Sequence, residues 1–173
     1  MQLAILITTQ NRPQRVEQLL RKIASAVTMP HDVFVAECSN ATHDFKNAVT
    51  VNVPGSLRRD DCAGLAAALA AARKAGSYDY YWILTEEVSF DSDTDVVLGL
   101  IDRLERERLM AIAAPTWNQA GFSPRPDPAT PDGWRAVASC ELRGVVMKAA
   151  GIDGGGFLNT EFHMGVGALP EVC

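Results

Sequence analysis

The sequence contains no cysteine pair at the spacing of a metal or redox motif. Its four cysteines, Cys38, Cys62, Cys140 and Cys173, are scattered over 173 residues, and the three histidines do not cluster with them. This distribution argues against a structural zinc site, which needs closely spaced Cys and His ligands. Scattered cysteines are typical of free thiols in a reducing compartment, so we expect a cytoplasmic protein.

The sequence also lacks the segments that direct a chain into or across a membrane. The first residues contain no basic stretch followed by a long apolar core, which argues against a signal peptide. The longest run of small apolar residues, Ala63 to Ala72, is too short to span a bilayer. We therefore expect no transmembrane segment.

Basic residues are outnumbered, with 16 Lys and Arg against 21 Asp and Glu, and the sequence pI is about 5.2. Nucleic acids and anionic membranes bind basic surfaces, so neither is expected as a general partner. The glycine-rich GxGxxG and P-loop motifs are absent as well, which weakens the case for an NAD enzyme or a nucleotide hydrolase.

What the sequence does contain is an ordinary globular composition, with 47% hydrophobic residues. The length predicts a single domain over residues 1–173, large enough to bury a substantial core. Short continuous apolar runs predict buried strands. The expected strands are Leu3–Ile7, Val33–Ala36, Val49–Val53, Tyr80–Leu84 and Leu109–Ala114, with a weaker edge strand at Ala136–Leu142.

Helical patterns separate these runs. One helix is expected to start at Pro13, and a second follows Asp60 or Asp61 and stops near Gly76. A third is expected after a cap at Asp91 or Asp93. The segment from Val145 to Ala150 is interpreted as a short helix ended by Gly151, after a long proline-rich loop that begins at Pro115. Alternating strands and helices predict an α/β fold, a three-layer sandwich with a mostly parallel central sheet.

Polar residues follow four of the expected strands, and this convergence is the strongest functional signal. Ligands of parallel sheets bind beyond the carboxyl ends of the strands. The polar groups expected there are Thr8 to Arg12, Glu37 with Ser39 and Asn40, Arg58 to Asp61, and Thr85 to Glu87. Adjacent carboxylates such as Glu86 and Glu87 suit a hard cation, Mg²⁺ or Mn²⁺, and Arg58 with Arg59 would suit a diphosphate.

Three stretches carry a resemblance to a known family. "ILITTQNRPQRVEQLLRKI", "GLAAALAAARKAGSYDYYWILTEEVSF" and "AAGIDGGGFLNTEF" resemble, in order and spacing, the opening strand, the acidic strand end and the later acidic segment of family 2 glycosyltransferases of the GT-A type. The resemblance runs from Leu3 to about Phe162. It implies a GT-A fold, a nucleotide-sugar donor, a saccharide or other hydroxyl acceptor, and Mn²⁺ or Mg²⁺ as cofactor.

The resemblance also implies roles for individual residues. Thr9 and Asn11 match the donor-binding loop, and Glu37 matches the acid that contacts the base or ribose. Glu87 matches the metal-binding acid, and Glu161 matches the region that supplies the base for the acceptor. Together with the polar loops, this gives the expected donor-binding set: Thr9, Asn11, Glu37, Arg58, Asp61 and Glu86.

The sequence departs from the family pattern at some of these places. Thr85 stands where the first aspartate of the acidic motif is usual, and Phe162 follows Glu161 where a second acid is usual. The family usually continues further beyond the later acidic pair. These departures motivate an alternative, a non-catalytic nucleotide- or protein-binding domain on a degenerate transferase scaffold.

Three further alternatives stay open. A nucleotidyltransferase would share the sheet and metal chemistry, but "TTQNRPQR" lacks the glycine-rich loop expected after its first strand. Glu86 and Glu87 could form an exposed turn before a helix. Thr9 and Asn11 could simply cap the helix that starts near Pro13.

Overall fold

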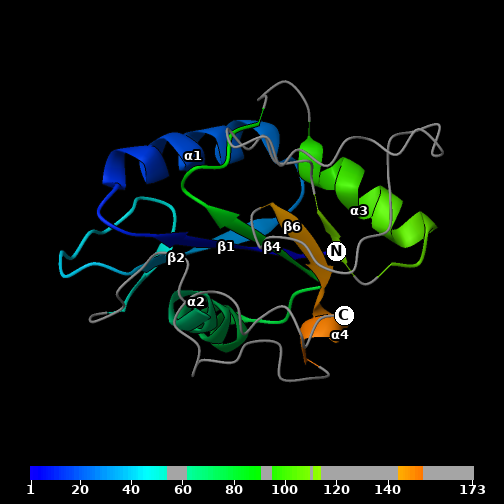
Figure 1. The fold of residues 1–173 in the computed structure, drawn as a ribbon. Helices are drawn as coiled ribbons and strands as arrows, with labels where there is room; N and C mark the ends of the chain where they lie inside the picture. The colour runs from blue at the N-terminus through cyan, green and yellow to red at the C-terminus, as the bar shows by residue number, and fades with distance from the viewer. Residues whose placement is uncertain (54–61, 91–94, 110, 114–143, 154–173) are drawn as a thin grey trace, which may run out of the picture.

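The computed structural model describes residues 1–53, 62–90, 95–109, 111–113 and 144–153, and Figure 1 shows their arrangement. A six-stranded sheet lies between two layers of helices. The strands are β1 (Leu3–Thr9), β2 (His31–Glu37), β3 (Val49–Asn52), β4 (Tyr80–Thr85), β5 (Ala111–Ala113) and β6 (Val145–Lys148). The helices are α1 (Pro13–Ala26), α2 (Cys62–Ala75), α3 (Val96–Arg106) and α4 (Ala149–Asp153). The α/β class and the layered, mostly parallel sheet expected from the sequence are confirmed.

The strand order creates a switch point beside β1. The order is β3-β2-β1-β4-β6-β5, and β1 pairs in parallel with both β2 and β4. The chain therefore runs outward from β1 to β2 and β3, then returns to the other side of β1 as β4. In such sheets the usual place for a ligand is the region beyond the carboxyl ends of the two central strands, which is named the crevice.

Alternate side chains of β1 enter two separate cores, which explains its continuous apolar run. Leu3, Ile5 and Ile7 pack toward α1 and α3, and Ala4 and Leu6 pack toward α2 and α4. Figure 1 shows α1 and α3 on one face of the sheet and α2 and α4 on the other. A strand covered on both faces has no solvent side, so its sequence does not alternate between apolar and polar residues. None of the helices described is long and apolar enough to cross a bilayer.

The expected helix from Val145 to Ala150 is wrong. Val145–Lys148 forms β6, which pairs antiparallel with both β4 and β5, and the helix begins only at Ala149. Val145, Val146 and Met147 are fully buried in the sheet. A four-residue apolar run is too short for periodicity to decide between strand and helix, and here pairing with two distant strands decides. The expected edge strand at Ala136–Leu142 lies outside the described residues.

Helix α2 approaches the sheet closely at Gly64. A Cβ atom built on Gly64 would lie 2.5 Å from Sγ of the buried Cys38, which follows β2 directly. Such a contact is too short for any real side chain, so glycine permits this approach. As a result the first turns of α2 lie against the carboxyl end of β2, next to the crevice.

The cap of α3 is Asp95, and neither Asp91 nor Asp93 is the cap as expected from the sequence. The Asp95 carboxylate accepts a hydrogen bond from the Leu98 backbone N–H at 3.0 Å. It also accepts bonds from the backbone N–H and the hydroxyl of Thr28, at 2.8 and 2.7 Å. Asp95 therefore joins the start of α3 to the loop that connects α1 with β2, a role that depends on residues 67 positions apart.

Replacing Asp95 by alanine is expected to lower the free energy of unfolding by about 2 kcal/mol, because both the helix cap and the bonds from Thr28 are lost. Burial of Asp95 opposes its ionisation, but hydrogen bonds from Thr28 and Leu98 outweigh it and lower the pKa of the carboxyl. The stability that ionised Asp95 adds to the fold is therefore fully present above its pKa in the unfolded chain. It is lost as the pH falls through the lower pKa of the folded protein. Urea unfolding at neutral and acid pH measures this.

The matched control is Asp102→Ala, an exposed aspartate on the same helix. It is expected to change stability by less than about 0.5 kcal/mol. Equal losses in the two variants would contradict the capping role of Asp95.

Candidate functional site

The loop between β1 and α1 is held in a specific conformation at the switch point. Asn11 has a φ of 56°, the left-handed region that asparagine tolerates better than most residues. Arg12 occupies the N-cap of α1 without a side-chain capping bond, and Pro13 begins the helix. Thr9 belongs to β1 and Asn11 precedes the cap, so the alternative that either residue caps α1 is wrong.

The buried side chain of Glu37 holds the loop between β1 and α1 through a hydrogen bond to its backbone. It is the last residue of β2 and its side chain is fully buried. Its Oε1 accepts hydrogen bonds from the backbone N–H groups of Asn11, at 3.3 Å, and Ser39, at 3.1 Å. Its Oε2 has no hydrogen-bond partner within the described part of the chain. A buried carboxylate oxygen without a partner is costly, so this atom is suited to a ligand that donates a hydrogen bond.

Thr9 lies next to Glu37 and also carries a buried oxygen without a hydrogen-bond partner among the described residues. The two residues are register partners at the ends of β1 and β2. Thr9 is fully buried, and its hydroxyl also has no hydrogen-bond partner in the segments described. Because side chains alternate along a strand, Thr9 and Glu37 share the α1 face with Ile7 and Val35. The Thr9 hydroxyl and Glu37 Oε2, both buried and without hydrogen-bond partners among the described residues, thus belong to neighbouring strand ends at the crevice.

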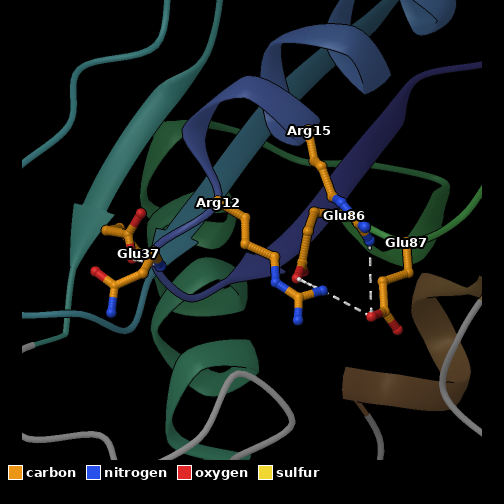
Figure 2. Close-up of polar contacts among 6 residues, drawn as sticks. Arg12, Arg15, Glu37, Glu86 and Glu87 are labelled. Atoms are coloured by element: carbon orange, nitrogen blue, oxygen red, sulfur yellow. Dashed lines mark hydrogen bonds and ion pairs between the residues drawn. The ribbon is translucent and has the colours of Figure 1, made fainter.

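On the other side of β1, the acidic pair after β4 is joined to the arginine at the start of α1. Arg12 Nη1 lies 2.7 Å from Oε1 of Glu87 and 3.4 Å from Oε1 of Glu86. Arg15, one helical turn later, lies 3.9 Å from the same Glu87 oxygen. Figure 2 shows the Arg12 side chain between Glu37 and the two acidic residues, with Arg15 pointing toward Glu87.

The two carboxylates differ in their access to solvent. The Glu86 side chain is 0% exposed, and the Glu87 side chain is 30% exposed. A buried carboxylate is tolerated only beside an opposite charge or hydrogen-bond donors, and Arg12 supplies part of that compensation for Glu86. The alternative of a fully exposed acidic turn is therefore wrong for Glu86, whereas Glu87 does present a carboxylate to the crevice.

Glu86 and Glu87 supply two carboxylates that suit a divalent cation, but both are already paired with Arg12. Mg²⁺ and Mn²⁺ are commonly bound through one or two carboxylates together with substrate phosphates, and Glu86 and Glu87 can supply two. Residues 1–53, 62–90, 95–109, 111–113 and 144–153 bring no three His, Cys, Asp or Glu side chains together. The Arg12 guanidinium already pairs with Oε1 of both carboxylates, so a cation that took these two oxygens would have to displace it.

Five of the residues expected from the sequence thus lie around one crevice: Thr9, Asn11, Glu37, Glu86 and Glu87. Their elements, β1, β2 and β4, are adjacent in the sheet, which brings the ends of the three strands together. Arg58, Arg59, Asp61, Glu161 and Phe162 lie outside the described residues, so their expected roles stay predictions.

Arg12 and Arg15 were not predicted as site residues, although Arg12 was counted among the polar groups after the first strand. The signal is present in "NRPQR". A proline after Arg12 marks the helix start, and a spacing of three residues places both arginines on one side of the first turn. Their acidic partners, 75 positions away for Arg12 and Glu87, are visible only in three dimensions.

No family model and no curated protein matches the sequence.

Proposed function

We propose that the protein is a glycosyltransferase of the GT-A type. It would transfer a sugar from a nucleotide-diphosphate donor to a hydroxyl of an acceptor, with Mn²⁺ or Mg²⁺ as cofactor. The observation that carries the proposal is the pair of buried polar atoms, Glu37 Oε2 and Thr9 Oγ1, that lack partners among the described residues. They lie at the switch point of the sheet, where α/β proteins bind nucleotides.

The nucleoside fits the part of the crevice beside Glu37. A carboxylate oxygen there accepts a hydrogen bond from an imide N–H, an amino group or a ribose hydroxyl. Thr9 offers a hydroxyl that donates or accepts, and Asn11 is held next to Glu37 by the bond from its backbone N–H. These three residues form the core of the proposed donor-binding set. Arg58 and Asp61 are assigned to that set only by their position in the polar stretch after the third expected strand.

The diphosphate fits the part of the crevice beside Glu86, Glu87 and the start of α1. When bound to Glu87, the divalent cation would neutralise the leaving diphosphate. Arg12 and Arg15 add two guanidinium groups at the positive end of the α1 dipole. Glu161 is the proposed base that removes the proton of the acceptor hydroxyl, a role that carboxylates fill in other enzymes.

Calorimetric titration with uridine and guanosine diphosphate tests the proposal. One of the two nucleotides is expected to bind, and binding is expected to be about tenfold tighter or more with Mn²⁺ present, because the cation links carboxylate to phosphate. The corresponding nucleoside is the control, since it lacks the phosphates and should show no effect of Mn²⁺. Absence of binding by either diphosphate, with and without Mn²⁺, would remove the proposal.

A second candidate is a binding domain without turnover. The observation that favours it is the engagement of Glu86 and Glu87 by Arg12, together with Thr85 in place of an acid at the end of β4. It predicts nucleotide or protein binding without hydrolysis of a nucleotide sugar. Metal-dependent hydrolysis that disappears in Glu87→Ala would decide against it.

A further inference from the structure

Arg12 holds the two carboxylates that the proposed cation requires. Its Nη1 is the atom that contacts Oε1 of both Glu86 and Glu87. The Arg12 side chain is 41% exposed and the Glu87 side chain 30%, so this pair is in contact with solvent. An arginine in such a position can change partners by rotating its own side chain, with no movement of the backbone.

The pairing of Arg12 with the two carboxylates occupies groups that a metal and a diphosphate would both use. Among the described residues, Arg12 and Arg15 lie within 4 Å of carboxylate oxygens of Glu86 and Glu87. While the Arg12 guanidinium is paired with these carboxylates, it is not available to a phosphate group. A divalent cation that took the carboxylates would leave the Arg12 guanidinium available to an anion.

A second observation indicates that the crevice receives a ligand. Glu37 Oε2 and Thr9 Oγ1 are fully buried, and no hydrogen-bond partner for them exists in the described ranges. Both belong to the same sheet face as α1, whose first turn carries Arg12. The site therefore contains two buried oxygens without hydrogen-bond partners among the described residues, at Glu37 and Thr9. It also contains a guanidinium, that of Arg12, which is paired with carboxylates of the protein itself.

We propose that Arg12 acts as an internal counter-cation that competes with the divalent metal for Glu86 and Glu87. When the metal takes these carboxylates, Arg12 turns to the diphosphate of the donor. Metal and nucleotide thereby strengthen each other's binding, and neither binds well alone. The exchange rests on the proposed function for its nucleotide step, whereas the competition between Arg12 and the metal does not.

The competition is tested by titrating Mn²⁺ alone into wild type, Arg12→Gln and Arg15→Gln, followed by calorimetry and by the electron spin resonance of free Mn²⁺. Arg12→Gln is expected to bind Mn²⁺ about tenfold more tightly than wild type, because the charge-assisted bond at Glu87 no longer has to break. Arg15→Gln makes the same charge change at 3.9 Å from Glu87 and is expected to gain at most about threefold. Equal affinities in the two variants would overturn the proposal.

The exchange is tested by titrating uridine and guanosine diphosphate at saturating Mn²⁺. Arg12→Gln is expected to bind the nucleotide that wild type prefers about tenfold more weakly, while its affinity for the nucleoside stays unchanged. Unchanged diphosphate affinity would overturn the transfer of Arg12 to the phosphates. If neither protein binds any nucleotide, the proposed function fails and the transfer with it, and the Mn²⁺ titration still decides the competition.

Circular dichroism and the unfolding temperature verify that each variant is folded. Should Arg12→Gln not fold, Arg12→Lys replaces it in both titrations. Lysine keeps the charge but not the planar fork, so its Mn²⁺ affinity is expected to exceed that of wild type and to stay below a tenfold gain. An Mn²⁺ affinity equal to or below that of wild type would contradict the competition.

Discussion

Glu37→Gln is expected to weaken the binding of a nucleotide diphosphate by about 10- to 100-fold, the loss of a hydrogen bond to a charged group. The carboxylate oxygen offered to the donor, Oε2, is replaced by an amide that donates instead of accepting. The other oxygen, Oε1, keeps its bonds from Asn11 and Ser39, so the loop after β1 is retained. Calorimetry with Mn²⁺ and the preferred diphosphate measures the change.

The same substitution is expected to leave the protein at least as stable as wild type. Glu37 is 0% exposed and carries an oxygen with no hydrogen-bond partner in the described segments, an unfavourable state for a buried charge. A residue kept for binding has this signature, because removing it harms the ligand and spares the fold. Glu17→Gln, on the exposed side of α1, is the control and should affect neither property. A Glu37→Gln protein that is less stable but binds normally would show that Glu37 is structural.

Trp82→Ala is expected to lower the free energy of unfolding by about 3 to 5 kcal/mol, the usual cost of removing a large aromatic from a core. Trp82 lies in the middle of β4, is 2% exposed, and packs toward α1 and α3. Its ring centroid lies 5.4 Å from that of Phe90, which follows the acidic pair. Loss of the indole would therefore also loosen the segment that carries Glu86 and Glu87.

Trp82→Phe is the matched variant, and its loss should be clearly smaller, about 1 to 2 kcal/mol. The indole N–H is buried and has no hydrogen-bond partner among residues the structure describes, so phenylalanine removes an unsatisfied donor as well as some packing. Urea unfolding followed by circular dichroism compares the two variants. If phenylalanine were as damaging as alanine, the indole N–H would have a partner after all.

Much of the fold could be predicted, because its central strands are buried on both faces. The apolar runs Leu3–Ile7, Val33–Ala36 and Tyr80–Leu84 mark interior strands without any knowledge of their neighbours. β6 could not be predicted in this way. Four residues from Val145 to Lys148 carry too little periodicity, and their conformation is decided by pairing with β4 and β5.

The cap of α3 shows a similar limit. Asp91, Asp93 and Asp95 are all suitable capping residues, and their sequence context does not separate them. Asp95 is selected because its carboxylate also receives two hydrogen bonds from Thr28, in a loop 67 residues earlier. The two bonds from Thr28 add to the local capping preference of aspartate, and they favour Asp95 over Asp91 and Asp93 as the cap of α3.

The candidate site likewise has features that follow from the sequence and features that only tertiary contacts decide. By itself the sequence determined which polar residues end the strands and hence which side chains meet at the crevice: Thr9, Asn11, Glu37, Glu86 and Glu87. Strand periodicity and the parallel sheet require this convergence. The tertiary structure alone decided how these groups are paired. The Arg12 guanidinium joins Glu86 and Glu87, and Oε1 of Glu37 holds the loop while its Oε2 lacks a partner among the described residues. The physical reason is that a long side chain chooses its partner by charge and distance in space, and that choice leaves no pattern along the chain.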